Sequence, residues 1–246
     1  MMKDHIYDKD TQVGESPAMS WDTADLYRYE QSIPLKIPGY EHMHHMMEKL
    51  LAASITDNND IHILVTGAGG GKELTLLGAS HQEWQLTGMD TSFQMLKLAQ
   101  QKAEEAGITG QTTLLQGTIE NLPEAALYDG ATCMLTLHFI QGMEAKKSFL
   151  RQLAQRLKPG APLIIAAVNT DLASPVYPVM MQAWREHMLQ AGIYAEEWDR
   201  FAASLGEQSD PVSGEIMVQL LAECGFSRMT RFFGAFWVEA YYAIRD

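Results

Sequence analysis

The sequence is poor in cysteine and in basic residues, and it contains no long apolar run. Its two cysteines, Cys133 and Cys224, show no metal-type spacing and are too few for a disulfide scaffold, which favours a reducing compartment. No apolar stretch approaches the roughly 18–20 residues that a membrane-spanning helix needs. Residues 1–5 are polar and lack the apolar core of a signal peptide. We therefore expect a cytoplasmic protein without a membrane segment.

The shortage of basic residues also bears on the binding partners. Lysine and arginine number 18 against 31 aspartate and glutamate, which gives a net charge of −13. Proteins that bind nucleic acid use lysine and arginine to replace the counterions of the phosphates. Here Lys146 and Lys147 are the one adjacent basic pair. Extended contact with RNA or DNA is therefore disfavoured, and a small-molecule partner is expected.

Strand and helix patterns alternate from residue 61 onward. Short apolar, β-branched runs are followed by helical patterns, which predicts a parallel sheet covered on both faces. The predicted strands are residues 61–66, 85–89, 112–116, 130–136, 163–168, 227–233 and 236–244. Before them, residues 1–20 read as a polar tail and residues 21–31 and 39–54 as helices. Residues 170–213 interrupt the rhythm with two further helical patterns.

The most informative motif is a run of glycines where the first strand ends. Gly67-Ala68-Gly69-Gly70-Gly71 leads directly into a helix that begins at Lys72. Glycines let a backbone approach a ligand closely, and the first amides of the helix face it. A phosphate-binding P-loop is excluded because the spacing is one residue short and Glu73 follows Lys72. A dinucleotide-binding turn would need glycine where Lys72 stands, and a short-chain dehydrogenase would need a Tyr-x-x-x-Lys pair, which is missing.

Gly67-x-Gly69-x-Gly71 resembles the first motif of the Rossmann-like S-adenosylmethionine-dependent methyltransferases. Asp90 ends the second predicted strand, 23 residues after Gly67. An acid there accepts both ribose hydroxyls of an adenosine ligand, or else simply begins the next turn and helix. The segments 117–123, 128–140 and 157–163 resemble later motifs of these enzymes in the right order. The resemblance implies S-adenosylmethionine as cofactor, no metal, and methyl transfer to a small molecule.

Other segments resemble the carboxy-S-adenosylmethionine synthase family, which has the same fold and uses prephenate to make a carboxymethyl group. These are Trp21-Asp22, Ile37-Pro38-Gly39-Tyr40 and Cys224-Gly225-Phe226. By this resemblance Tyr40 contacts the sulfonium end, Gly67 to Gly69 the methionine part, Asp90 and Thr91 the ribose, Thr118 and Ile119 the adenine, and Arg200 the added carboxylate. The complete predicted cofactor set is Tyr40, Gly67, Ala68, Gly69, Gly71, Asp90, Thr91, Thr118, Ile119 and Met134.

Three departures from that second family weaken the carboxymethyl hypothesis. Met134 stands where the family has asparagine, Val65 where it has aspartate, and Thr118 where it has an acid. Ordinary methyl transfer is therefore the preferred hypothesis, with the synthase-like reaction as one alternative. A second alternative is a non-catalytic scaffold that keeps the fold and binds a ligand.

Catalytic and acceptor residues are harder to identify from the sequence. His138 follows the fourth strand and is either a general base or a histidine packed beneath the lid. Arg200, Trp184 and Tyr177 lie in residues 170–213 and are candidates for binding an acceptor. If the acceptor is an anion, Arg200 is the residue expected to pair with its charge. The alternatives are core packing for the aromatic residues and a solvated helix charge for arginine. His42 and His45 lack metal-ligand spacing.

Together these features predict an α/β protein with a Rossmann-like, doubly wound, mostly parallel seven-stranded sheet. Residues 1–55 are expected to be an N-terminal tail and helices that cover the cofactor site. Residues 56–246 are expected to form the S-adenosylmethionine-binding methyltransferase domain, with a helical lid at about 170–213. The aromatic residues between 232 and 242, together with the family resemblance, predict a homodimer.

Overall fold

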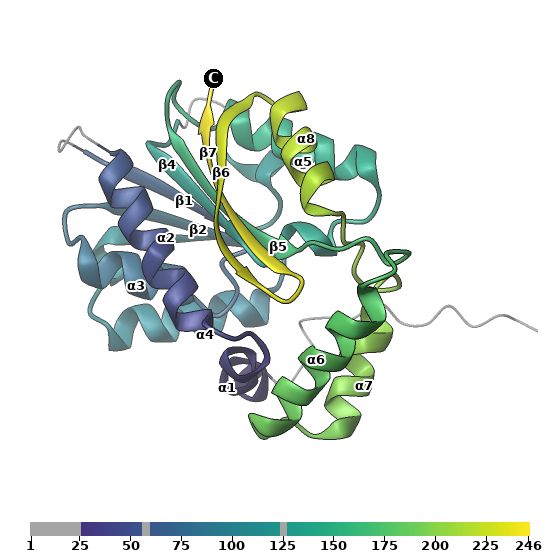
Figure 1. Cartoon of the computed structure of the whole chain (residues 1–246). Helices are drawn as coiled ribbons and strands as arrows, with labels where there is room; N and C mark the ends of the chain where they lie inside the picture. The colour runs from purple at the N-terminus through teal and green to yellow at the C-terminus, as the bar shows by residue number, and fades with distance from the viewer. Residues whose placement is uncertain (1–25, 56–59, 124–126) are drawn as a thin grey trace, which may run out of the picture.

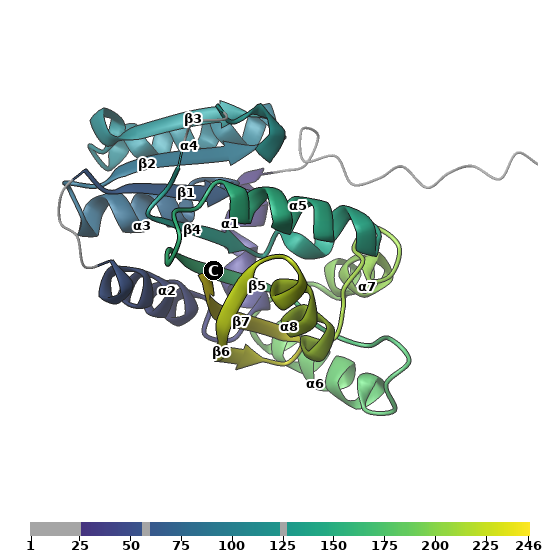
Figure 2. The ribbon, with the colours of Figure 1, turned by 90° about the horizontal axis from the view of Figure 1, so that it is seen from above.

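A seven-stranded sheet forms the centre of the structure, a computed structural model that describes residues 26–55, 60–123 and 127–246 (Figure 1). Its strand order is β3-β2-β1-β4-β5-β7-β6, so that β3 and β6 form the two edges (Figure 2). β1 to β5 pair in parallel, whereas β7 is antiparallel to both β5 and β6. The predicted seven-stranded, mostly parallel sheet is confirmed. The strands are β1 His62–Thr66, β2 Gln85–Asp90, β3 Thr112–Gln116, β4 Gly130–Met134, β5 Pro162–Val168, β6 Phe226–Ala235 and β7 Val238–Arg245.

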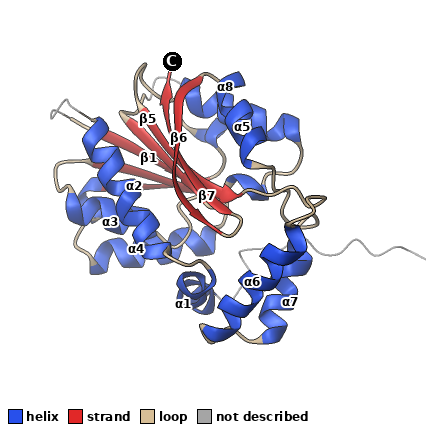
Figure 3. Cartoon of the chain, in the orientation of Figure 1, coloured by secondary structure: helices blue, strands red, loops and turns tan. Residues whose placement is uncertain are grey.

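Helices surround the sheet (Figure 3). Their bounds are α1 Leu26–Lys36, α2 Tyr40–Ser54, α3 Lys72–Ser80, α4 Phe93–Glu105, α5 Met143–Gln155, α6 Tyr177–Gln190, α7 Ala195–Ser204 and α8 Gly214–Glu223. In β1, Ile63 and Val65 belong to one hydrophobic core and Leu64 to another. This alternation follows from the two-residue period of a strand. The first core also contains buried residues of α2 and α3, and the second contains residues of α5 and α8, so both faces of the sheet are covered.

Two element boundaries differ from the sequence prediction for local reasons. β4 ends at Met134 rather than at residue 136, because Leu135 adopts a positive φ of 56° and turns the chain out of the sheet. The first helix extends to Lys36 instead of ending at residue 31, and Pro34 lies inside it. The helix α1 contacts α2 and α6, and Trp184 of α6 bonds to its last residue, Lys36, which supports a helical end that the local sequence disfavours.

Helices α1, α6 and α7 lie together beyond one end of the sheet (Figure 1). The indole Nε1 of Trp184 in α6 donates a 2.7 Å hydrogen bond to the carbonyl of Lys36. Carbonyls in the last turn of a helix such as α1 lack a partner inside the helix, and the indole supplies one here. Glu197 of α7 forms ion pairs with Lys36 at 2.8 Å and with Arg28 at 3.0 Å. The N-terminal helix and the two helices between β5 and α8 are thus joined directly.

The predicted tail of residues 1–20 and the Trp21-Asp22 pair lie outside the described residues. Within residues 26–55, 60–123 and 127–246, no helix is both long and apolar enough to cross a membrane.

Candidate functional site

A cavity of about 1920 Å³ lies at the carboxyl ends of the parallel strands. Thr66 of β1, Asp90 of β2, Met134 of β4 and Val168 of β5 all line it, together with residues of α1, α2 and α7. Open α/β sheets bind their ligands in this position. Of the predicted site residues, those that line the cavity are Tyr40, Gly67, Ala68, Gly69, Asp90, Thr91, Thr118, Ile119, Met134, His138, Trp184 and Arg200. Gly71 and Tyr177 are not among the lining residues.

The glycine turn faces the cavity, and its glycines have different physical roles. Gly69 has a φ of 49°, and a Cβ added to it would meet no atom closer than the Gly67 carbonyl oxygen, at 3.9 Å. Gly69 therefore leaves open space on the cavity side. Gly71 has a φ of 83°, and an added Cβ would lie 2.9 Å from the Cα of Ala99 in α4. Gly71 instead allows α3 and α4 to pack closely, which explains why it does not line the cavity.

Backbone amides hold the Asp90 carboxylate at the end of β2. Its Oδ2 accepts a 2.9 Å hydrogen bond from the amide of Gly69, and its Oδ1 accepts one of the same length from the amide of Ser92. Ser92 then caps α4 by accepting from the amide of Met95 at 3.2 Å. Each carboxylate oxygen keeps a second lone pair. Asp90 therefore begins the next turn and also presents a fixed acceptor to the cavity.

His138 lies beneath the cavity in a buried environment. Its Nδ1 accepts a 3.3 Å hydrogen bond from the amide of Val168, so the neutral ring carries its proton on Nε2. Burial is the largest cause that lowers the pKa of His138, to about 3, and the positive charge of Lys146 lowers it further. The unprotonated nitrogen, Nδ1, already accepts a hydrogen bond, and the ring is a weak base. His138 is therefore poorly suited to act as a general base near neutral pH.

The aromatic candidates of the helical segment have structural partners. Trp184 is 1% exposed, and its indole N–H is already bonded to Lys36. Tyr177 stacks on Trp237 with ring centroids 6.1 Å apart. Arg200 lines the cavity from α7, and none of the described carboxylates lies within ion-pair distance of it. Arg200 is thus the candidate of the three whose polar group stays available to a ligand.

The fold and the site can now be compared with known proteins. Residues 63–160 match the family described as a methyltransferase domain. The ubiquinone biosynthesis O-methyltransferase of Rickettsia canadensis is 32% identical over 127 residues, which are 52% of this chain and 50% of that protein. The O-methyltransferase rstn1 of Aspergillus nomiae is 32% identical over 114 residues, 46% of this chain and 49% of that protein. The chain spans about half the length of these curated relatives.

Residues 63–160 are thus similar to methyltransferase domains, and the wider match to O-methyltransferases covers about half of the chain. Solved structures agree on the fold. A methyltransferase of Methanosarcina mazei superposes with a TM-score of 0.56 at 17% identity, covering 79% of this chain and 96% of that chain. An O-methyltransferase family 2 protein of Planctomyces limnophilus, solved in complex with apigenin, superposes with a TM-score of 0.56 at 15% identity, covering 84% of this chain and 62% of that chain.

S-adenosylmethionine is the cofactor of such domains, and the residues present here fit it. The open space beside Gly69 suits the close approach of a ligand to the backbone. The Asp90 carboxylate offers acceptor positions of the kind that a ribose diol needs. The cavity is more than large enough for one small cofactor and leaves room for a second molecule.

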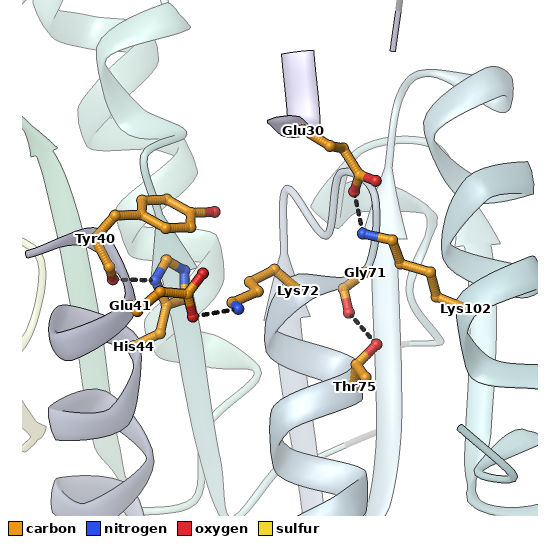
Figure 4. Close-up of polar contacts among 8 residues, drawn as sticks. All are labelled: Glu30, Tyr40, Glu41, His44, Gly71, Lys72, Thr75 and Lys102. Carbon is orange, nitrogen blue, oxygen red and sulfur yellow. Dashed lines mark hydrogen bonds and ion pairs between the residues drawn. The ribbon is translucent and has the colours of Figure 1, made fainter. Parts of the chain in front are cut away.

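The cavity is also lined by residues that sequence reasoning missed. Glu73 and His44 line the cavity although they are buried, and Glu30 and Lys102 form an ion pair at its wall. Figure 4 shows the ring of Tyr40 above His44 at the start of α2, with the Nδ1 of His44 bonded to the carbonyl of Tyr40 at 2.9 Å. Glu73 was visible only as the residue after Lys72. No sequence pattern distinguishes a buried acid there from an exposed first-turn acid.

Proposed function

We propose that the protein transfers a methyl group from S-adenosylmethionine to a small molecule. The observation that carries this proposal is the glycine turn facing the cavity, with Asp90 fixed by the amide of Gly69 at its side. The experiment has two steps. Calorimetry with S-adenosylmethionine and its demethylated product should give micromolar binding, and radiolabelled methyl transfer should then be measured against a metabolite panel. Binding of NAD(P) without binding of either ligand would refute the proposal.

The proposed cofactor contacts follow the lining of the cavity. Gly67, Ala68 and Gly69 would flank the methionine part, and Asp90 and Thr91 the ribose. Thr118 and Ile119 would border the adenine, with Tyr40 and Met134 near the sulfonium end. When bound, this cofactor supplies a methyl carbon that its sulfonium already activates. The contribution of the chain is alignment of the two reactants and exclusion of water.

The environment of His138 limits the kind of acceptor. With its pKa lowered to about 3, His138 removes no proton efficiently at neutral pH. We therefore propose an acceptor that loses its proton readily or carries a free lone pair. His138 then acts by holding the end of β5 through the amide of Val168. The catalytic role considered for His138 would be supported only if the His138→Asn variant, once shown to be folded, lost its turnover.

We further propose that Arg200 binds an anionic acceptor, because Arg200 lines the cavity and its guanidinium has no described acidic partner. In Arg200→Ala the affinity for S-adenosylmethionine should stay unchanged while the KM of the acceptor rises about tenfold or more. Arg200→Lys is the control for charge alone. If Arg200→Ala instead weakened only carboxy-S-adenosylmethionine, the synthase-like alternative would replace this proposal. The methyltransferases named above give that alternative no support.

Two broader features complete the proposal. We propose a cytoplasmic homodimer, supported by the two buried free cysteines and by β6, an edge strand with β7 as its partner. Light scattering at micromolar concentration would refute the dimer by reporting a monomer. Cofactor binding combined with silence against every acceptor in the panel would instead favour the non-catalytic scaffold.

A further inference from the structure

Most charged groups that line the cavity neutralise one another. Glu30 pairs with Lys102 and Glu41 with Lys72, as Figure 4 shows, and Glu197 pairs with Lys36. Asp90 differs, because two backbone amides satisfy its carboxylate. These residues therefore need no charge from a ligand.

Glu73 is the exception among the buried acids of this wall. It lies in the first turn of α3, directly after the glycine turn, and is 5% exposed. It lines the cavity, yet within the described part of the chain no other residue gives its carboxylate a hydrogen bond or an ion pair. Its own backbone amide is the donor that it has. An ionised carboxylate buried in this way is costly unless a cation meets it.

The surroundings of Glu73 favour a positive ligand group. The charged and polar groups around it come from several elements: Tyr29 of α1, Tyr40 of α2, Asp90 of β2, the buried thiol of Cys133 in β4 and Lys72 of α3. The single cation, Lys72, is paired with Glu41. Electron-rich tyrosine rings also attract cations. The protein supplies negative potential and aromatic faces here, and leaves the positive charge to the ligand.

We propose that Glu73 binds the α-ammonium group of S-adenosylmethionine as its counter-charge. This inference rests on the proposed function and deepens it. The ammonium has N–H groups that donate to carboxylate oxygens, whereas a sulfonium has no such donor. The sulfonium also loses its charge during methyl transfer, so a carboxylate beside it would stabilise the ground state more than the transition state. The ammonium keeps its charge throughout, so pairing with it positions the cofactor at no cost to the reaction.

The test compares three ligands on wild type and Glu73→Gln by calorimetry at pH 7.5. S-adenosylmethionine and S-adenosylhomocysteine both carry the ammonium, whereas 5′-methylthioadenosine lacks the amino-acid part. We expect the first two to lose roughly 10- to 100-fold in affinity, the range for a charged hydrogen bond. The third should change less than twofold. Glu73→Asp keeps the charge and should fall between wild type and Glu73→Gln. Glu196→Gln, which removes an exposed acid outside the cavity lining, is the matched control and should bind all three normally.

Each other result contradicts the inference in a distinct way. Equal loss of affinity for all three ligands would mean general damage to the site. Loss of affinity for S-adenosylmethionine alone would mean that Glu73 pairs with the sulfonium and not with the ammonium. Unchanged binding of all three would make Glu73 irrelevant to the cofactor. Wild-type protein that binds none of the three ligands would refute the proposed function itself. Thermal unfolding of each variant verifies that it is folded.

Discussion

Replacing Gly69 or Gly71 by alanine separates the two physical roles of the glycine turn. Both residues have positive φ angles, 49° and 83°, which cost an alanine about 1–2 kcal/mol each. At Gly69 the added methyl group meets no atom within 3.4 Å, so the loss of stability should stay near this conformational cost. At Gly71 the methyl group would lie 2.9 Å from the Cα of Ala99, and forcing α3 away from α4 adds about 1–3 kcal/mol.

The effects on ligand binding should be the reverse of those on stability. The methyl group of Gly69→Ala enters the cavity and should lower the affinity for S-adenosylmethionine at least about tenfold. A tenfold loss corresponds to about 1.4 kcal/mol of binding free energy. Gly71→Ala lies outside the lining and should keep its affinity within about threefold while it is folded, a change below 1 kcal/mol. Urea unfolding and calorimetry measure the two quantities. Equal destabilisation of the two variants, or normal binding by Gly69→Ala, would refute this reasoning.

Three further predictions concern buried polar groups. Burial raises the pKa of Glu73 to about 8 in the cofactor-free protein, so the folded state keeps a proton that the unfolded chain releases above pH 4.5. Stability should therefore fall as pH rises from 4.5 to 8, by at most about 1.4 kcal/mol per pH unit, and Glu73→Gln should abolish this slope in urea titrations; an unchanged slope would contradict it. For His138 the pH dependence of stability has the opposite sign. Its pKa of about 3 keeps the folded state unprotonated, whereas the unfolded chain binds the proton below pH 6.5. Wild type should lose stability on acidification from pH 6.5 to 3, and His138→Asn should lose less than wild type if the assignment holds. Trp184→Phe deletes the 2.7 Å hydrogen bond to the Lys36 carbonyl and should cost about 1–3 kcal/mol in urea unfolding, whereas a loss below 0.5 kcal/mol, roughly the floor for a made hydrogen bond, would show that water replaces the indole.

The core of the fold was predictable because its strands and turns follow from short, local sequence patterns. Strands β1, β2, β3 and β5 occupy nearly the residues that the apolar runs indicated, and the glycine turn and Asp90 fall at the ends of β1 and β2. Parallel strands end at the same edge of a sheet, so the motif residues had to come together there. The predictions were weaker where tertiary contacts override local preference. The extension of α1 through Pro34 and the end of β4 at Leu135 are the two examples.

The sequence by itself predicted the sheet and its ligand-binding edge, since these depend on the hydrophobic period and on where the glycines and the acid fall along the chain. The class of cofactor came from the resemblance to Rossmann-like methyltransferases. Only the tertiary structure decided which side chains are available at that edge. It joined Trp184 to Lys36 and occupied the Nδ1 of His138, while leaving Arg200 without a described acidic partner. It also buried Glu73, which local sequence cannot distinguish from an exposed helix-start acid. Burial and pairing are properties of residues distant in sequence, because they depend on what the folded chain brings beside each group.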